Sequence, residues 1–215
     1  MDRTISLREG LSNNKTFREK SDYIWTYYKI HILTTLILIF FVGSYISAQI
    51  NRQEVYCNIT YVGNSINVEE LTPAKDKLND ILLNNNKKLV INFESIFTDD
   101  KSSAGLAMTE KLHVNIAAQQ IDIAIVNKEF FEQNFSSEMF LNLESLNGFS
   151  TLPLSNHELT KKTDSTGTNG TYGIPIKNLK LLNDINFANN DNILVVISNT
   201  EHNDAVVNVL KTLLT

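Results

Sequence analysis

The strongest feature of the hydrophobic pattern is an apolar run near the N-terminus. Residues 30–51 contain no Asp, Glu, Lys or Arg, and more than half of them are Ile, Leu, Phe or Val. At 1.5 Å per residue, a helix of this length reaches about 33 Å, enough to cross a hydrocarbon core of about 30 Å. The run therefore predicts one transmembrane helix over residues 30–51, between a leader over residues 1–29 and a domain over residues 52–215.

Beyond this run, the chain alternates between strand-like and helix-like patterns. Segments rich in β-branched and aromatic residues predict strands over residues 55–62, 88–97, 121–126, 172–176 and 192–198. Apolar residues at helical spacing predict helices that begin near Thr72, near Ser103, at Lys128 and after Thr200. Polar residues 157–170 predict an exposed loop, and Pro175 predicts that strand 172–176 lies at a sheet edge. The alternation is typical of a three-layer α/β lobe with a mostly parallel sheet.

Charges on the two sides of the apolar run predict its orientation. Residues 15–29 contain the cations Lys15, Arg18, Lys20 and Lys29, whereas residues 52–66 contain Arg52 alone. Because positive charge favours the cytoplasmic side, we expect a cytoplasmic N-terminus and residues 52–215 outside the cell. Aromatic residues suit the headgroup layer at the cytoplasmic end: Tyr23, Trp25, Tyr27 and Tyr28.

A cleaved signal peptide is the alternative interpretation of this run. Ser47 and Ala48 are small enough for a cleavage site, whereas Ile46 suits such a site poorly. The charged leader is long, and the apolar run exceeds the roughly 7–15 residues of a typical signal core. We therefore favour an uncleaved anchor over cleavage.

The predicted domain is acidic and contains one cysteine. Residues 52–215 have 13 Lys and Arg against 20 Asp and Glu. This negative balance disfavours nucleic acid as a partner and disfavours lying flat on anionic lipid. A single cysteine, Cys57, excludes an intramolecular disulfide. Its place in a predicted strand favours a buried thiol over an interchain bridge or a lipid attachment site.

Motifs for catalysis and metal binding are missing from the sequence. It contains no G-x-S-x-G, no H-E-x-x-H and no phosphate-binding loop, and its four histidines are scattered. We therefore expect a protein that is not an enzyme and has no metal site and no cofactor. Asp99 and Asp100 suit either a bound cation or the cap of the helix that follows them.

Four polar residues are candidates for binding a ligand: Asp122, Thr163, Asp164 and Thr171. Asp122 interrupts an apolar strand, and a buried carboxylate is costly unless it is paired. We favour hydrogen bonding of Asp122 at the start of its strand over a position facing a pocket at the sheet edge. The other three residues belong to the polar loop, a place where binding residues are common, or follow it directly.

A family resemblance rests on three stretches of the chain. The first covers residues 112–146, with the apolar strand 121–126, then Phe130, Phe131 and Leu141; the others are residues 172–176 and 193–214. They resemble the first lobe, the crossover strand and the returning strand and helix of extracellular solute-binding proteins of the type 2 periplasmic-binding-protein-like class. Members of that class insert a second lobe after the crossover and bind solute between the lobes. In this chain, only the short segment 177–191 occupies that place.

The resemblance implies a single membrane-tethered bacterial lobe without an interlobe cleft. We expect an extracytoplasmic interaction module, a non-catalytic accessory subunit of a transporter or envelope complex, with the lipid bilayer and another membrane protein as partners. The alternative is a membrane-tethered binder or sensor of a small-molecule ligand, with its pocket at the strand ends where open α/β sheets bind.

Overall fold

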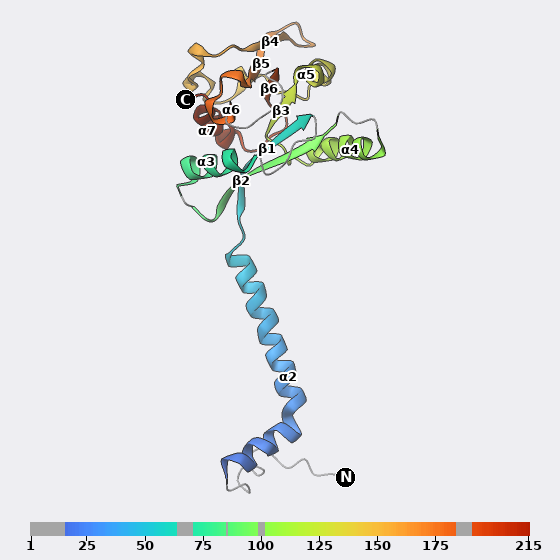
Figure 1. The fold of residues 1–215 in the computed structure, drawn as a ribbon, viewed down its shortest axis with the longest axis vertical. Helices are drawn as coiled ribbons and strands as arrows, with labels where there is room; N and C mark the ends of the chain where they lie inside the picture. The colour runs from blue at the N-terminus through green and yellow to red at the C-terminus, as the bar shows by residue number, and fades with distance from the viewer. Residues whose placement is uncertain (1–15, 64–70, 85, 99–101, 184–190) are drawn as a thin grey trace. The chain divides into compact units, whose positions relative to one another are not determined.

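The computed structural model describes residues 16–63, 71–84, 86–98, 102–183 and 191–215 (Figure 1). The chain forms two compact units, Met1–Arg52 and Gln53–Thr215. Asp99 and Asp100, which we expected to bind a cation or to cap a helix, lie outside the described residues. The cap of that helix is Ser102, whose hydroxyl oxygen accepts a hydrogen bond from the N–H of Gly105 at 3.2 Å.

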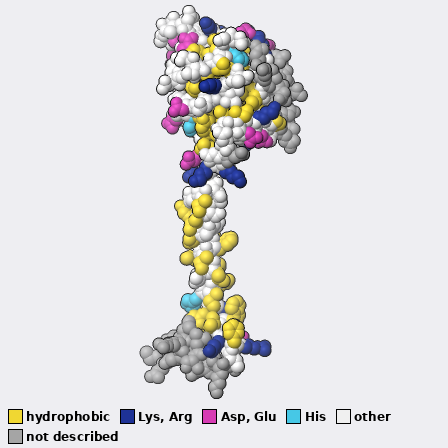
Figure 2. All heavy atoms as spheres, turned by 90° about the vertical axis from the view of Figure 1, so that its left-hand side faces the viewer, with side chains coloured by type: hydrophobic (Ala, Val, Ile, Leu, Met, Phe, Trp, Pro, Cys, Tyr) yellow, Lys and Arg dark blue, Asp and Glu magenta, His cyan; other side chains and the backbone are white. Residues whose placement is uncertain are grey.

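The first unit contains one long helix, α2 (Phe17–Ile50). Its stretch Ile24–Ile50 is long and apolar enough to cross a membrane, and none of the most apolar part is buried (Figure 2). The helix begins at Phe17, before the membrane span predicted over residues 30–51, and residues 17–29 contain no Gly or Pro that would interrupt it. Thr34 donates its hydroxyl proton to the carbonyl of Ile30 at 2.8 Å, so this side chain needs no partner outside the helix.

The second unit alternates strands and helices. Its strands are β1 (Glu54–Gly63), β2 (Leu89–Phe97), β3 (Ile123–Asn127), β4 (Thr160–Thr163), β5 (Asn169–Pro175) and β6 (Asn192–Val196). Its α-helices are α3 (Thr72–Leu83), α4 (Ser103–Ala117), α5 (Lys128–Asn134), α6 (Lys180–Asn183) and α7 (Asn203–Leu213). Short 3₁₀ turns follow α5, among them η2 (Phe135–Ser137) and η3 (Leu143–Ser145). The predicted α/β class is therefore confirmed.

The strands form one six-stranded mixed sheet in the order β2-β1-β3-β6-β5-β4. β1 runs parallel to β2 and to β3, whereas the β3–β6, β6–β5 and β5–β4 pairs are antiparallel. The sheet is thus mostly antiparallel, and the expectation of a mostly parallel sheet was wrong. Continuous apolar runs identify strands that are buried on both faces, but such runs carry no information on strand direction.

A hairpin replaces the loop expected over residues 157–170. β4 pairs with β5 through Thr160–Gly173 and Thr163–Asn169, and β4 is the edge strand instead of β5. Pro175 is tolerated inside the sheet because it is the final residue of β5. β4 has the sequence TKKT and lacks an apolar face, so backbone pairing and the turn that closes the hairpin hold it in place.

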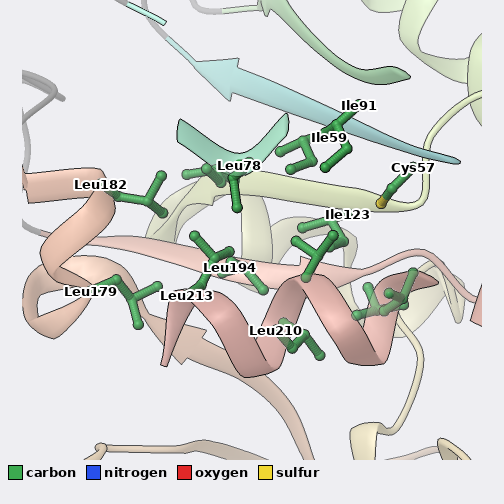
Figure 3. Close-up of a cluster of buried hydrophobic side chains, with 14 of the residues drawn as sticks. Cys57, Ile59, Leu78, Ile91, Ile123, Leu179, Leu182, Leu194, Leu210 and Leu213 are labelled. Carbon is green, nitrogen blue, oxygen red and sulfur yellow. The ribbon is translucent and has the colours of Figure 1, made fainter. Parts of the chain in front are cut away.

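Two apolar cores cover the two faces of the sheet. Alternate residues of β3 point to opposite sides, with Ile123 and Ile125 in one core and Ala124 and Val126 in the other. The first core lies under α3 and α7 and includes Leu78, Leu194 and Leu210 (Figure 3). The second core lies under α4 and α5 and includes the following large side chains: Ile96, Leu112, Phe131 and Val195. The three expected layers are therefore present.

Cys57 lies fully buried in β1, as its place in a predicted strand indicated. Burial raises the pKa of its thiol well above the ordinary value, and the nearby charge of Asp122 raises it further. The thiolate is the reactive form of cysteine, so this side chain is a packing residue in the native protein.

Candidate functional site

A cavity of about 530 Å³ opens in the α/β unit between the β4–β5 turn and the chain that follows α5. Hydroxyl groups make up most of its polar lining: Ser136, Ser145, Thr163, Ser165, Thr166 and Ser198. The lining also includes the carboxylates of Glu138 and Asp164. Pockets of roughly 300–1,000 Å³ with a few fixed polar groups are typical of small-molecule sites.

Aromatic side chains form the apolar wall of this cavity. Phe135 and Tyr172 meet edge to face, with their ring centroids 4.9 Å apart. Phe140 stacks on the fully buried Phe131 at a centroid distance of 5.1 Å. Because these rings are packed against the core, the wall is preorganised and does not have to assemble around a ligand.

Asp164 organises the turn at the mouth of the cavity. Its Oδ1 accepts hydrogen bonds from the Thr166 hydroxyl at 2.7 Å and from the N–H groups of Thr166 and Thr168 at 2.9 Å each. The Thr166 hydroxyl, followed by these N–H groups, lowers the pKa of the Asp164 carboxyl. Gly167 completes the turn with a φ of +84°, a conformation that side chains with a Cβ disfavour.

Two further hydrogen bonds tie the turn to the cavity wall. The Tyr172 hydroxyl donates to Asp164 Oδ2 at 3.3 Å, and the Ser165 hydroxyl donates to Glu138 Oε1 at 2.7 Å. Burial raises the pKa of Tyr172, and the charge of Asp164 adds to that effect. The phenol therefore stays protonated and keeps its role as a donor at neutral pH.

Three of the four candidate residues lie at or beside this cavity. Thr163 and Asp164 line it, whereas Thr171 lies next to the lining and donates its hydroxyl proton to Glu144 Oε1 at 2.8 Å. Gly170 allows the close approach of the segment after α5, because a Cβ at this position would lie 2.4 Å from the Asn142 amide nitrogen. The sequence thus located the turn, although it did not identify the aromatic wall opposite.

Asp122 lies elsewhere, fully buried directly before β3. Its Oδ2 accepts the backbone N–H of Asn58 at 2.7 Å, and its Oδ1 accepts the Thr200 hydroxyl at 2.5 Å. The Nδ1 of His202 lies 3.1 Å from both carboxylate oxygens. Asp122 is thus hydrogen-bonded at the start of its strand, the arrangement that we favoured. We call this group of four residues the Asp122 clamp.

His202 is the residue that sequence reasoning overlooked, because its partner lies 80 positions earlier in the chain. A histidine beside a carboxylate also occurs in hydrolases, where the nucleophilic hydroxyl donates to the histidine. Here the Thr200 hydroxyl donates to Asp122 instead. Thr200 was the one local indication of this arrangement in the sequence. Its hydroxyl oxygen accepts a hydrogen bond from the N–H of His202 at 3.2 Å, just before α7. The geometry suits a structural clamp between β1, β3 and the start of α7.

A second hollow, of about 580 Å³, lies among α3, α6 and α7. Ile81, Leu181 and Leu213 give it an apolar surface, with Lys77 and Lys211 among the other lining residues. The hydroxyls of Thr212 and Thr215 are bonded within their own helix or its end. Because the first cavity has polar groups fixed from several elements, it is the better candidate site. Among the described residues, no group of three His, Cys, Asp or Glu side chains could hold a metal ion.

Comparison with known proteins finds a distant similarity in structure. No protein family model matches the chain, and no curated protein matches it. An extracellular solute-binding protein family 1 from Alicyclobacillus acidocaldarius subsp. acidocaldarius DSM 446 is similar in structure, with 16% sequence identity and a TM-score of 0.37. The similarity covers 58% of this chain and 28% of that protein.

Proposed function

We propose that the chain is a single-pass membrane protein whose α/β unit lies outside the cell and acts as a non-catalytic interaction module. The observation that carries this proposal is the exposed apolar surface of α2. Phe40 and Ile30 are 72% and 70% exposed, and the apolar side chains between them are largely exposed as well. Exposure of so much apolar surface to water costs free energy, whereas its contact with lipid does not.

The orientation rests on the charges that flank this helix. Cations before the apolar run favour a cytoplasmic N-terminus, so we infer that the acidic α/β unit lies on the other side of the membrane. A signal sequence can pass the same test of length and composition, so the experiment must separate an anchored protein from a cleaved one.

Labelling with a membrane-impermeant maleimide tests both the orientation of the chain and the presence of an uncleaved anchor. Cys57 is buried, so the native chain is its own unlabelled control. Ser21 in α2 and Ser150 in the α/β unit are exposed positions for new cysteines. We expect Ser150→Cys to be labelled in intact cells and Ser21→Cys only after lysis, both on a membrane-bound, full-length chain. Labelling in the reverse pattern refutes the orientation, and a shortened soluble chain refutes the anchor.

The proposal also assigns the protein a role as an accessory subunit of a membrane complex. A single α/β unit joined to a membrane helix suits a protein that is held beside a larger membrane complex, such as a transporter or envelope assembly. Purification of the tagged chain in a mild nonionic detergent, followed by mass spectrometry, tests this role. We expect a stoichiometric membrane protein to co-purify, and a monodisperse monomer without a partner contradicts the role.

Ligand binding is the second candidate function, and the cavity beside Tyr172 specifically favours it. The cavity combines an aromatic wall with a carboxylate, Asp164, that its own turn holds in place. In this function the unit is a tethered binder or sensor of a small molecule. A ligand that binds the folded state raises the unfolding temperature, so a thermal-shift screen of the chain in micelles tests it.

A further inference from the structure

The charged groups of the cavity beside Tyr172 all have the same sign. Asp164 and Glu138 line it, and no Lys, Arg or His belongs to its lining among the described residues. The hydrogen bonds within the turn hold the Asp164 carboxyl in its ionised form, since they lower its pKa. A ligand in this cavity therefore meets two negative charges without a compensating protein cation in the lining.

Each carboxylate has one oxygen that can accept a further hydrogen bond from a ligand. Three donors of the turn occupy Asp164 Oδ1, whereas Oδ2 has one long bond of 3.3 Å from Tyr172. Ser165 occupies Glu138 Oε1, and no hydrogen bond to the second oxygen of Glu138 is found within the described part of the chain. Both carboxylates are thus positioned by one oxygen and keep acceptor capacity on the other.

The aromatic wall adds a second attraction for positive charge. The face of an aromatic ring is electronegative and attracts ammonium groups within about 6 Å of its centroid. The protein itself gives an instance: the Lys162 ammonium lies 6.0 Å from the ring centroid of Phe135 while it pairs with Glu132. The Phe135 ring thus already contacts one cation of the protein, and the same residue lines the cavity together with the two carboxylates.

We propose that this cavity binds a small organic cation, with its positively charged nitrogen beside the carboxylates of Asp164 and Glu138 and its apolar part against Tyr172. The proposal rests on the ligand-binding function of the α/β unit and specifies the class of ligand. A volume of about 530 Å³ accommodates a quaternary ammonium alcohol or a short polyamine. An anionic ligand is disfavoured, because it would bring a third negative charge to the same cavity.

Isothermal titration of the full chain in maltoside micelles tests the proposal. The probes are choline, spermidine and the neutral choline isostere 3,3-dimethylbutan-1-ol. We expect at least one of the two cations to bind at least about fivefold more tightly than the neutral isostere, because only a cation gains the charge interactions. Tighter binding of either cation supports the proposal, and the preference between the two shows whether the cavity fits a compact or an extended cation. Absence of binding by both cations, or equal binding of the isostere, overturns the proposal.

Charge-neutralising variants locate the cation. Asp164→Asn and Glu138→Gln keep the shape of each side chain, and each is expected to weaken binding about two- to fivefold. Glu110→Gln makes the same chemical change on the exposed surface of α4 and is expected to leave binding unchanged. The unfolding temperature of each ligand-free variant verifies that it folds. Equal weakening by all three variants overturns the assignment to this cavity.

The outcomes also separate this inference from the function on which it rests. If the thermal-shift screen finds a neutral or anionic ligand instead, ligand binding stands and the cation class is refuted. Maleimide labelling of Ser150→Cys reports on the membrane topology whichever ligand binds.

Discussion

A substitution of Asp122 tests directly how much the hydrogen bonds of the Asp122 clamp stabilise the protein. Asp122→Ala removes the common acceptor of the Asn58 N–H, the Thr200 hydroxyl and the His202 ring. Each buried donor that loses its partner costs about 1–3 kcal/mol. Two donors are shielded from water, because Thr200 is buried and Asn58 belongs to β1, which β2 and β3 flank. The His202 side chain is 38% exposed and can bond to water instead.

We therefore expect Asp122→Ala to lower the free energy of unfolding by about 2–5 kcal/mol. Asp122→Asn keeps one carbonyl acceptor in the same place, so it should cost about half as much. Glu201→Ala removes an exposed carboxylate one residue from the clamp and should change stability by less than about 0.5 kcal/mol. The three variants together separate the loss of buried hydrogen bonds from the loss of negative charge.

Urea unfolding of the full chain in nonionic micelles, followed by far-ultraviolet circular dichroism, measures these differences. Tryptophan fluorescence is unsuitable, because the single tryptophan, Trp25, lies in α2. A loss below about 1 kcal/mol for Asp122→Ala would refute the view that this carboxylate satisfies two shielded donors. A larger loss for Asp122→Asn than for Asp122→Ala would refute it as well.

Three further predictions use the same assay. Phe131→Ala removes a fully buried ring that stacks on Phe140 and should cost about 3–5 kcal/mol, whereas a cost below about 1 kcal/mol contradicts the packing. Both polar atoms of the Asn192 side chain are buried without a partner among the described residues, so Asn192→Leu should stabilise the protein by about 1 kcal/mol; destabilisation contradicts this. Burial raises the pKa of Cys57 above the ordinary 9.0, so the unfolded thiol ionises first and stability falls as the pH rises through 9.0. Cys57→Ala should make that fall shallower, and an unchanged slope refutes it.

The α/β class could be predicted because apolar runs mark strands buried on both faces. The run at residues 121–126 corresponds to β3, and alternate side chains of that strand enter the two cores. Strand direction was not predictable in this way, because Ile193 and its neighbours are equally apolar in a parallel or an antiparallel β6. β4 was not predicted, because its sequence TKKT has no apolar pattern. Its stability comes from pairing with β5 and from the turn between the two strands.

Only the turn of the candidate site, which is formed by residues close together in the sequence, could be predicted. Asp164 and its neighbours stand in a polar segment with Gly167, a composition that marks a turn. Phe135 and Tyr172 lie far apart in the sequence, and apolar patterning marks each as a core residue without showing that they share a cavity wall. The same holds for His202, which reaches Asp122 only after β6 has taken its place beside β3.

The place of β6 imposes an order on the folding of the α/β unit. β6 pairs with β3 on one side and β5 on the other, yet it follows every other strand in the chain. Without Asn192–Val196, nothing in the strand order joins strands β1–β3 to the β4–β5 hairpin, so they form two separate half-sheets. Each half-sheet then has an open apolar edge, the kind of surface that recruits chaperones or pairs with other nascent chains. A chain that ends before residue 192 therefore lacks the strand that joins the two half-sheets, and we expect it not to form a stable α/β unit.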